Sequence, residues 1–347
     1  MPGIGGGYRP SRLVMSIADH SIIYIHRGRN AKSIAIGKAL TQRDYNFDYR
    51  GGSLVLLLFK AWITSTEIPK ADVYFIEGAL CFWPAYFLKK KYKTAKILMM
   101  VPEPAFYLDP RRNGLQKLLF YWRMWLYRHV FGFIAISEMV KADIQRYCKQ
   151  PVLIGHHFVS NIERFLPLKS EGGYQILFVC DRPSETGYIK GLAETIAIFT
   201  ELNTLLPETR LVVVGAGSDH LSFSHPHIRA LGHVDMTDII PTCRIILSPA
   251  KYDALLLAVA ECGLAGVVPV ISSHVGIKEL IEPVCPELVI YSNATSDYVA
   301  VIRSVLEWPD EKYTDVMQKL RKKLQVLNEE SCLAEYRDAW TQLLGTR

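Results

Sequence analysis

The chain has 347 residues, of which half are hydrophobic and 21% are charged, so it is not an intrinsically disordered protein. Its net charge of +6 is unevenly distributed. Residues 1–165 hold 24 Lys/Arg and 11 Asp/Glu, whereas residues 166–347 hold 16 and 23. The length suits two domains better than one. The basic half indicates an anionic partner, such as a membrane surface, a nucleic acid or a phosphorylated substrate.

The cysteines and the apolar runs bear on the compartment of the protein. The seven cysteines have no paired or metal-like spacing, which favours free thiols in a cytoplasmic protein. The longest apolar run, residues 53–59, is far shorter than the ~20 residues of a membrane span. There is no signal-peptide pattern, so we expect a soluble or peripheral protein. The glycine-rich residues 1–12 neither follow a strand nor precede a helix, and we interpret them as a frayed terminus rather than a phosphate loop.

In the first half of the chain, short apolar runs alternate with helix-like stretches. We predict strands at 21–26, 71–78, 95–101 and 132–137, and helices at 31–43, 79–92, about 113–131 and 138–148. Ser137 is expected to cap the last of these helices. Residues 151–158 close this half.

The second half repeats the same rhythm. We predict strands at 174–180, 210–217, 244–249 and 267–273, helices at 191–206 and 253–266, and a helical tail. Regular alternation of strand and helix indicates parallel sheets that are covered on both faces. The sequence therefore predicts an α/β protein with two Rossmann-like domains facing each other, joined near the polar residues 161–173.

In such sheets, ligands bind beyond the carboxyl ends of the strands. Asp253 follows the strand at 244–249 and Glu261 lies eight residues later, about 12 Å along a helix and within about 80° around it. The two acids could address one elongated ligand. Alternatively, Asp253 could cap the helix and Glu261 could lie on an exposed face. Arg182 and Lys190, in the loop after 174–180, could neutralise a diphosphate, although ordinary surface cations are the simpler interpretation.

Residues 102–131 are unusually aromatic and basic. Lys117, Arg123 and Arg128 are interleaved with Phe, Tyr and Trp, and residues 89–96 add five lysines. This region could lie on an anionic bilayer, or it could be a helix packed under its own domain with its cations reaching outward. No nucleic-acid-binding motif accompanies it, so nucleic acid is not expected as a partner.

Two weaker signals are not interpreted as sites. The glycines at 215 and 217 resemble a dinucleotide loop, but the third glycine position is His220 and no clear helix follows. His156 and His157 are adjacent, but no third ligand is near them in the sequence, so we predict no metal site.

The order of these pieces resembles the family 4 retaining glycosyltransferases, which have the GT-B fold of two Rossmann-like parallel-sheet domains facing each other across a cleft. The resemblance covers nearly the whole chain and is strongest over residues 132–282. It is carried by CDRPSETGYIKG, similar to the Arg…Lys-Gly element of the family, and by LVVVGAGSD. It is also carried by SPAKYDALLLAVAECGLAGVVPVISSHVG, in which Asp253 and Glu261 match the Glu-x7-Glu element.

The resemblance implies a division of labour between domains. Residues 1–165 would bind the acceptor and residues 166–330 the nucleotide sugar, and the helix at 331–347 would cross back to the first domain. The implied reaction is a metal-independent, retaining transfer from a UDP- or GDP-sugar, without a cofactor. The acceptor would be lipid-linked or a glycan, at the cytosolic face of an anionic membrane.

Residue roles follow from the same resemblance. Glu261 would hold the ribose hydroxyls, and Asp253 would contact the donor sugar near the reacting carbon. Arg182 and Lys190 would hold the diphosphate and stabilise it as it leaves. The start of the following helix would present N–H groups to the same phosphates. The other expected donor-site residues are Gly215, Leu255, Leu256 and Gly276.

The sequence departs from the family pattern in three places. Asp253 is one methylene shorter than the usual Glu, and Val275 replaces the first glycine of a Gly-Gly loop. The N-domain histidine that often follows the strand at 95–101 is absent, and Pro102 and Glu103 stand there. Glu103 or Asp109 is expected to substitute for it. A nucleotide-sugar epimerase of the same fold, or a catalytically degenerate sugar-nucleotide-binding module, is the alternative.

Overall fold

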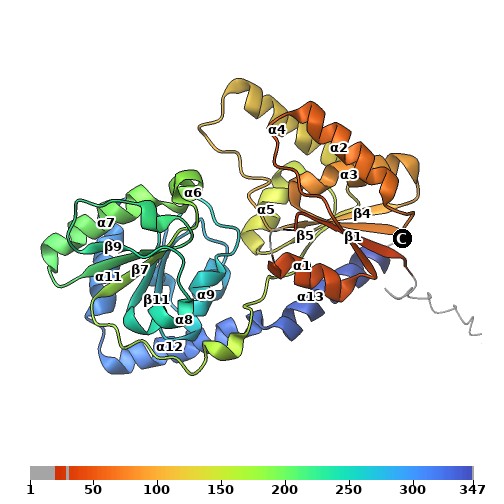
Figure 1. The fold of residues 1–347 in the computed structure, drawn as a ribbon. Coiled ribbons are helices and arrows are strands. Elements are labelled where there is room, and N and C mark those ends of the chain that lie inside the picture. The colour runs from red at the N-terminus through yellow and green to blue at the C-terminus, as the bar shows by residue number, and fades with distance from the viewer. Residues whose placement is uncertain (1–19, 29–30, 346–347) are drawn as a thin grey trace, which may run out of the picture.

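The computed structural model describes residues 20–28 and 31–345. The glycine-rich stretch at 1–12 lies outside these residues. The described chain forms two lobes, each built on a six-stranded parallel sheet with flanking helices (Figure 1). The prediction of two facing Rossmann-like domains is therefore confirmed.

The N-terminal sheet has the order β2-β1-β3-β4-β5-β6. Its strands are β1 (Ile22–His26), β2 (Arg43–Asn46), β3 (Val73–Glu77), β4 (Lys96–Val101), β5 (Gly132–Ala135) and β6 (Val152–Ile154). The helices of this half are α1 (Ala31–Leu40), α2 (Leu54–Glu67), α3 (Gly78–Lys91), α4 (Gly114–Leu126) and α5 (Glu138–Tyr147). As predicted, Ser137 caps α5 by accepting a hydrogen bond from the Val140 N–H.

The sequence did not reveal two elements of this half. The edge strand β2 has mostly exposed, polar side chains, so it lacks the apolar alternation of a strand, and its first residue was assigned to the preceding helix. Helix α2 is apolar on nearly all sides, and therefore has no helical period that could distinguish it from a short apolar run.

The C-terminal sheet has the order β12-β11-β10-β7-β8-β9. Its strands are β7 (Gln175–Val179), β8 (Arg210–Val214), β9 (Ile228–Ala230), β10 (Ile245–Ser248), β11 (Val268–Ser272) and β12 (Val289–Ile290). Its helices are α6 (Pro183–Lys190), α7 (Leu192–Leu205), α8 (Met236–Ile239), α9 (Leu257–Leu264), α10 (Lys278–Ile281), α11 (Thr295–Leu306) and α12 (Asp310–Leu324). Short 3-10 helices occur at Tyr127–His129, Ile162–Arg164, Ser218–His220, Ile240–Thr242, Pro286–Leu288 and Gln325–Leu327.

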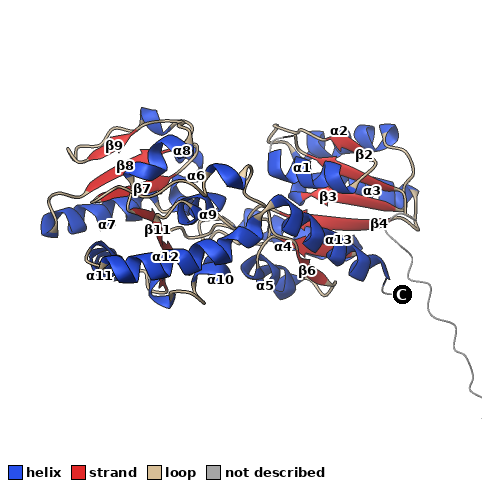
Figure 2. Cartoon of the chain, turned by 90° about the horizontal axis from the view of Figure 1, so that it is seen from below, coloured by secondary structure: helices blue, strands red, loops and turns tan. Residues whose placement is uncertain are grey.

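The last helix, α13 (Glu329–Gly345), packs against α1, β5 and β6 of the N-terminal domain. Figure 2 shows α12 and α13 passing from one lobe to the other. The Trp340 side chain is fully buried, and its ring lies 4.9 Å from that of Phe75 in an edge-to-face contact. Helix α13 thus contributes to the core of a domain that the chain left about 170 residues earlier. The domain limits at residues 165 and 330 stay predictions.

Two further features bear on the sequence predictions. All seven cysteines are free and buried, as expected. Over residues 20–28 and 31–345, no helix combines the length and apolar character needed to cross a bilayer.

We expect the substitution Trp340→Ala to lower the free energy of unfolding by about 3–5 kcal/mol, because it leaves a cavity between α13 and the N-terminal sheet. Urea denaturation followed by circular dichroism measures this change. The matched substitution Trp62→Ala, at a residue that is 53% exposed, should change the value by less than about 0.5 kcal/mol. Equal effects of the two substitutions would contradict the docking of α13.

Candidate functional site

The loops that follow β7 and β8 are bonded to each other at the carboxyl edge of the C-terminal sheet. The Arg182 N–H donates to the Ala216 carbonyl at 2.7 Å, and the Ala216 N–H donates to Asp181 Oδ1 at 2.8 Å. Gly215 has φ +134°, and a Cβ at this position would overlap the Cys180 carbonyl. The role of Gly215 in the structure is thus to let the two loops approach, and its contact with a donor stays a prediction.

Arg182 lies in the loop after β7, as predicted, but Lys190 is the last residue of helix α6, so the predicted loop position is wrong for Lys190. They lie at the two ends of helix α6, with Arg182 at the N-cap position. Pro183 occupies the first turn, where a missing N–H costs nothing, and Gly191 ends the helix in the left-handed conformation. The helix separates the two cations by about 12 Å along its axis. The Arg182 side chain is 62% exposed and pairs with Glu185 at 3.1 Å.

Lys190 is instead paired with one of the predicted acids. Its Nζ donates to Asp253 Oδ2, and both side chains are largely buried. Burial alone would lower the pKa of Lys190, but the charge and the hydrogen bond of Asp253 outweigh it and raise that pKa. Lys190 therefore stays positively charged at neutral pH. The structure brings together the lysine and the first acid that the sequence singled out.

Asp253 lies outside the helix that was predicted to contain it. Helix α9 begins at Leu257, and its N-cap residue is Leu256. Asp253 forms a strand-like bridge with Val275, and its carbonyl accepts the Gly276 N–H at 2.8 Å. Because these bonds come from a segment more than 20 residues away, they are invisible in the local pattern. Both the helix-cap role and the two-turn spacing to the second acid are therefore wrong.

The backbone around α9 is tightly constrained. Asp253 Oδ1 accepts the Leu255 N–H at 3.2 Å. A Cβ at Gly276 would overlap the Ala254 carbonyl, so only glycine fits there. Leu256 has φ +60°, a conformation that is costly for a branched side chain. In the part of the chain that the structure describes, three non-glycine residues have positive φ, and Leu256 and Arg182 are two of them. Backbone strain of this kind is concentrated at functional sites.

Glu261 lies in the second turn of α9 and faces the N-terminal domain. Lys32, from α1, places its Nζ 3.5 Å from Glu261 Oε1. Burial raises the pKa of the Glu261 carboxyl, and the Lys32 charge partly opposes that rise. The side chain is 15% exposed, which rules out the interpretation that it belongs to a solvated helix face.

The N-terminal sheet contributes a second polar cluster at its own carboxyl edge. Arg27 Nη1 donates to Glu103 Oε2 at 2.7 Å, and the Arg27 N–H donates to Glu77 Oε2 at 3.0 Å. Glu103 Oε1 accepts the Ala79 N–H at the start of α3. Burial is the main cause of a raised pKa at Glu77. Glu103 was predicted from the sequence, whereas Arg27 and Glu77 were missed. Both missed residues mark a strand end, since Arg27 directly follows β1 and Glu77 is the last residue of β3.

The predicted residues therefore form separate groups. One group contains Lys190 and Asp253, together with the backbone of Val275 and Gly276 that Asp253 contacts. Arg182 and Glu261 are outside this group, because Arg182 pairs with Glu185 and Glu261 faces Lys32. Among the described residues, no hydrogen bond or ion pair joins Glu103 to the C-terminal candidates. Asp109, the second N-terminal candidate, pairs with Arg111 at 2.6 Å.

The loop after β4 carries the contact between the two domains near this site. The rings of Tyr107 and Tyr252 lie 4.8 Å apart, and the Arg111 guanidinium lies 3.4 Å from the ring centroid of Tyr188 in α6. A hollow of about 650 Å³ opens between residues 49–54 and the start of α6, with Arg182 in its wall. Both domains therefore contribute to the walls of this hollow.

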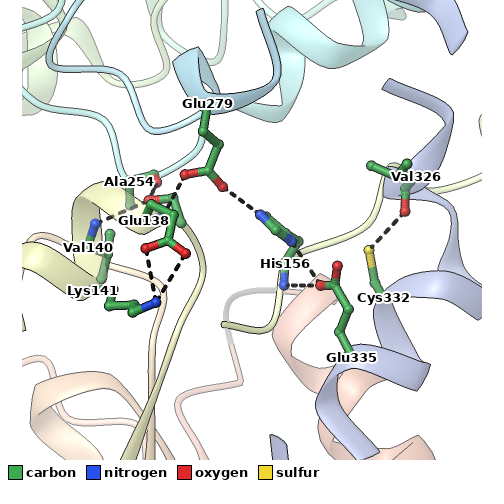
Figure 3. Close-up of polar contacts among 10 residues, drawn as sticks. Glu138, Val140, Lys141, His156, Ala254, Glu279, Val326, Cys332 and Glu335 are labelled. Carbon is green, nitrogen blue, oxygen red and sulfur yellow. Dashed lines mark hydrogen bonds and ion pairs between the residues drawn. The ribbon is translucent and has the colours of Figure 1, made fainter. Parts of the chain in front are cut away.

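A polar cluster at the junction of the domains fixes how they meet. The Ser137 hydroxyl donates to the Ala254 carbonyl at 2.7 Å, and the Glu138 N–H donates to Glu279 Oε2 at 2.6 Å. His156 lies between two carboxylates, 2.6 Å from Glu279 in α10 and 2.8 Å from Glu335 in α13 (Figure 3). The imidazole thus links the C-terminal domain to the helix that packs on the N-terminal one.

The two facing Rossmann-like domains, with cations and acids at their carboxyl edges, define the fold of GT-B glycosyltransferases. Residues 173–307 match the family described as "Glycosyl transferases group 1". The C-terminal half thus contains a group 1 glycosyltransferase domain, within a chain that has the two-domain GT-B architecture. No curated protein matches the chain by sequence.

Solved structures support the same fold. A sucrose-phosphate synthase from Thermosynechococcus elongatus superposes with a TM-score of 0.72 at 13% identity, covering 94% of this chain and 99% of that one. A trehalose-6-phosphate structure from E. coli, bound with UDP-2-fluoro glucose, gives 0.70 at 11% identity and covers 94% and 99%. A glycosyltransferase from Rickettsia africae gives 0.67 at 14% identity, with the same coverage. At these identities the likeness shows the fold alone.

No group of three or more His, Cys, Asp or Glu side chains in residues 20–28 and 31–345 is arranged to hold a metal ion. Metal independence stays a prediction, because a donor diphosphate can itself bring a cation.

The His156 cluster should make the stability of the protein depend on pH. Burial alone would lower the pKa of His156, but hydrogen bonds and charges from Glu279 and Glu335 raise it from 6.5 to about 9. The stabilisation is therefore complete below about pH 6.5 and is lost as the pH rises through about 9. We expect the melting temperature of the wild type to exceed that of His156→Gln at pH 6, and this difference to shrink by pH 10.

Calorimetry across this range measures the effect. The exposed substitution His220→Gln is the matched control, and its difference from the wild type should not change between pH 6 and pH 10. A difference for His156→Gln that is constant over the range would show that the imidazole is not held as a cation between the two carboxylates.

Proposed function

We propose that the protein is a metal-independent, retaining glycosyltransferase that moves a sugar from a UDP- or GDP-sugar to an acceptor held by the N-terminal domain. The observation that carries the proposal is the buried Lys190–Asp253 pair at the carboxyl edge of the matched domain, beside the start of α9. A cation, an acid and free helical N–H groups are what a sugar diphosphate requires of its site.

The chemistry assigned to these residues is mainly electrostatic. As the bond between the sugar and the diphosphate breaks, negative charge grows on the departing oxygen. Lys190 is held in place by Asp253 before the donor arrives, so it stabilises that charge without having to reorganise. Arg182, at the other end of α6, supplies the second cation, and its exposed guanidinium can turn towards the phosphates. Asp253 contacts the donor sugar, while Glu261 binds the ribose hydroxyls.

Relatives of the same fold support the donor and the stereochemistry. The E. coli trehalose-6-phosphate structure holds UDP-2-fluoro glucose, and another solved structure concerns glycosyl transfer with retention by a trehalose-6-phosphate synthase. These superpositions include 94% and 92% of the residues of this chain. We therefore propose a nucleotide sugar as the donor and a transfer that retains the configuration of the sugar.

We expect a thermal-shift screen with UDP, GDP, ADP, TDP and their sugars to identify one nucleotide that raises the melting temperature equally with and without EDTA. At 100 times the dissociation constant, a ligand stabilises the folded state by about 2.7 kcal/mol. Glu261→Ala should abolish this shift, because the carboxylate that receives the ribose is gone. The exposed acid in Glu311→Ala is the matched control and should leave it unchanged.

A full shift in Glu261→Ala would contradict the donor-site assignment, and a shift that EDTA removes would contradict metal independence. Product analysis with donor alone separates transfer from epimerisation, since an epimer formed without acceptor would contradict a transferase.

We further propose that the N-terminal domain binds the cytosolic face of an anionic membrane through helices α2 and α4. These helices carry an unusual number of exposed apolar side chains, which we call the docking surface: Val55, Leu56, Phe59, Trp62, Leu115, Leu118, Tyr121 and Trp125. Lys60, Lys117 and Arg128 accompany them. Large exposed apolar patches with cations around them are typical of membrane-binding surfaces.

The docking surface differs in composition from the one that the sequence indicated. Of the aromatic side chains in α4 and just after it, Phe120 and Tyr127 are buried in the domain core, so they are not available to a bilayer. Helix α2, which the sequence had not revealed, supplies about half of the exposed residues instead.

We expect Phe59→Asp and Trp125→Asp each to weaken binding to anionic phospholipid vesicles at least tenfold, because each places a charge at the bilayer interface. Flotation of the protein with vesicles measures binding. Leu205→Asp, at an exposed leucine of the C-terminal domain, is the matched control and should bind like the wild type. Binding should require anionic lipid and should weaken with salt. Equal binding to neutral vesicles would count against the electrostatic part.

A further inference from the structure

Helices α2, α3 and α4 enclose a groove that has no assigned role in donor binding or membrane docking. Its volume is about 660 Å³, within the range of small-molecule sites. Its apolar walls comprise Leu54, Leu57, Leu80, Trp83, Leu119 and Trp122. Because three helices form its walls and floor, the groove suits one elongated apolar chain.

Three arginines border the same groove with only one acid among them. Arg111 is paired with Asp109 at 2.6 Å. Within the described residues, Arg112 and Arg123 form no ion pair. Arg123 Nη2 donates to the Ala105 carbonyl at 2.7 Å, and its buried Nε has no hydrogen-bond partner. Burial, and then the neighbouring charge of Arg123, lower the pKa of Arg112. The groove therefore holds excess positive charge that an anion would neutralise.

The groove adjoins the hollow between the domains. Leu54, Leu57 and Leu80 line both the groove and the hollow that reaches Arg182. At the arginine side, Arg111 stacks on Tyr188 of α6, so this side borders the donor domain. The groove also borders the docking surface, because helices α2 and α4 contribute residues to both. An amphipathic ligand could therefore extend from the bilayer to the site of transfer.

We propose that this groove holds the apolar chain of the acceptor, and that Arg112 and Arg123 bind its phosphate or diphosphate group. The acceptor is then a phosphorylated lipid with a single apolar chain, whose hydroxyl-bearing head reaches the hollow beside Arg182. Guanidinium groups bind phosphate oxygens in pairs, which fixes the orientation of the head as well as its charge. This inference rests on the proposed transferase function and names the class of its second substrate.

The probe is farnesyl phosphate, which combines one prenyl chain with one phosphate, titrated below its aggregation concentration in the absence of vesicles. Calorimetry of the full chain gives the affinity. Quenching of tryptophan fluorescence reports the site, since the rings of Trp83 and Trp122 lie 5.6 Å apart in the groove. We expect saturable binding, with farnesol and inorganic phosphate each at least about tenfold weaker, because each offers only half of the interactions.

Two substitutions test the two halves of the groove. Arg112→Gln removes a half-buried cation, and Leu119→Trp fills the apolar channel from a residue that is 42% exposed. Each should weaken farnesyl phosphate binding roughly tenfold or more. Arg303→Gln is the matched control, since this exposed arginine of α11 lies in the C-terminal domain and pairs with Glu307, and it should bind like the wild type. Circular dichroism melting curves establish that each variant is folded.

Wild-type affinity in both groove variants would overturn the inference, as would equal binding of farnesol or of inorganic phosphate alone. The nucleotide thermal shift separates this inference from the proposed function. If the nucleotide shift is present and farnesyl phosphate does not bind, the lipid acceptor is wrong and the transferase proposal stands. If farnesyl phosphate binds and no nucleotide does, the transferase proposal fails and the acceptor role of the groove fails with it.

Discussion

The buried contact between Lys190 and Asp253 is the interaction on which the architecture of the donor side depends. An ammonium group that is taken out of water is tolerated only when an opposite charge compensates it. Here the partner comes from a segment that is itself held in place by strand-like bonds to Val275 and Gly276. Removing either partner would leave a buried charge uncompensated, so the end of α6 and the entry to α9 constrain each other.

This dependence explains why the fold was more predictable than the site. Strands such as β3 and β4 are buried on both faces, and therefore form continuous apolar runs that can be recognised in isolation. Ser137 was predictable as a cap because its partner, the Val140 N–H, is three residues away. Asp253 was identified as a site residue, but its conformation was not predictable. Its backbone partners lie more than 20 residues later in the chain and meet it only after the sheet has formed.

The same reasoning applies to the N-terminal domain, where the misses were larger. Arg27, Glu77 and Glu103 come from three different strand ends, and only the strand order β1-β3-β4 brings them together. Each follows an apolar run, which was a usable signal, but the sequence contains nothing that pairs them. Helix α2 was missed for the opposite reason. Its apolar residues surround the helix, because one face packs on α3 while the rest remains exposed, so the amphipathic period is absent.

Apolar side chains that stay exposed to water on a helix cost free energy. The apolar side chains of α2 and α4 are compensated only if a lipid phase or an apolar ligand covers them. Arg182, whose side chain is 62% exposed beside Glu185, can in turn bind an anionic ligand. The hollow lined by Leu54, Leu57 and Leu80 also has Arg182 in its wall, so it adjoins both the apolar helix α2 and this cation. His156, held between Glu279 and Glu335, links the C-terminal domain to the helix that packs on the N-terminal domain. A substrate with an apolar chain, a phosphate and a sugar would contact α2 and Arg182 at once, whereas neither a free sugar nor a free lipid would.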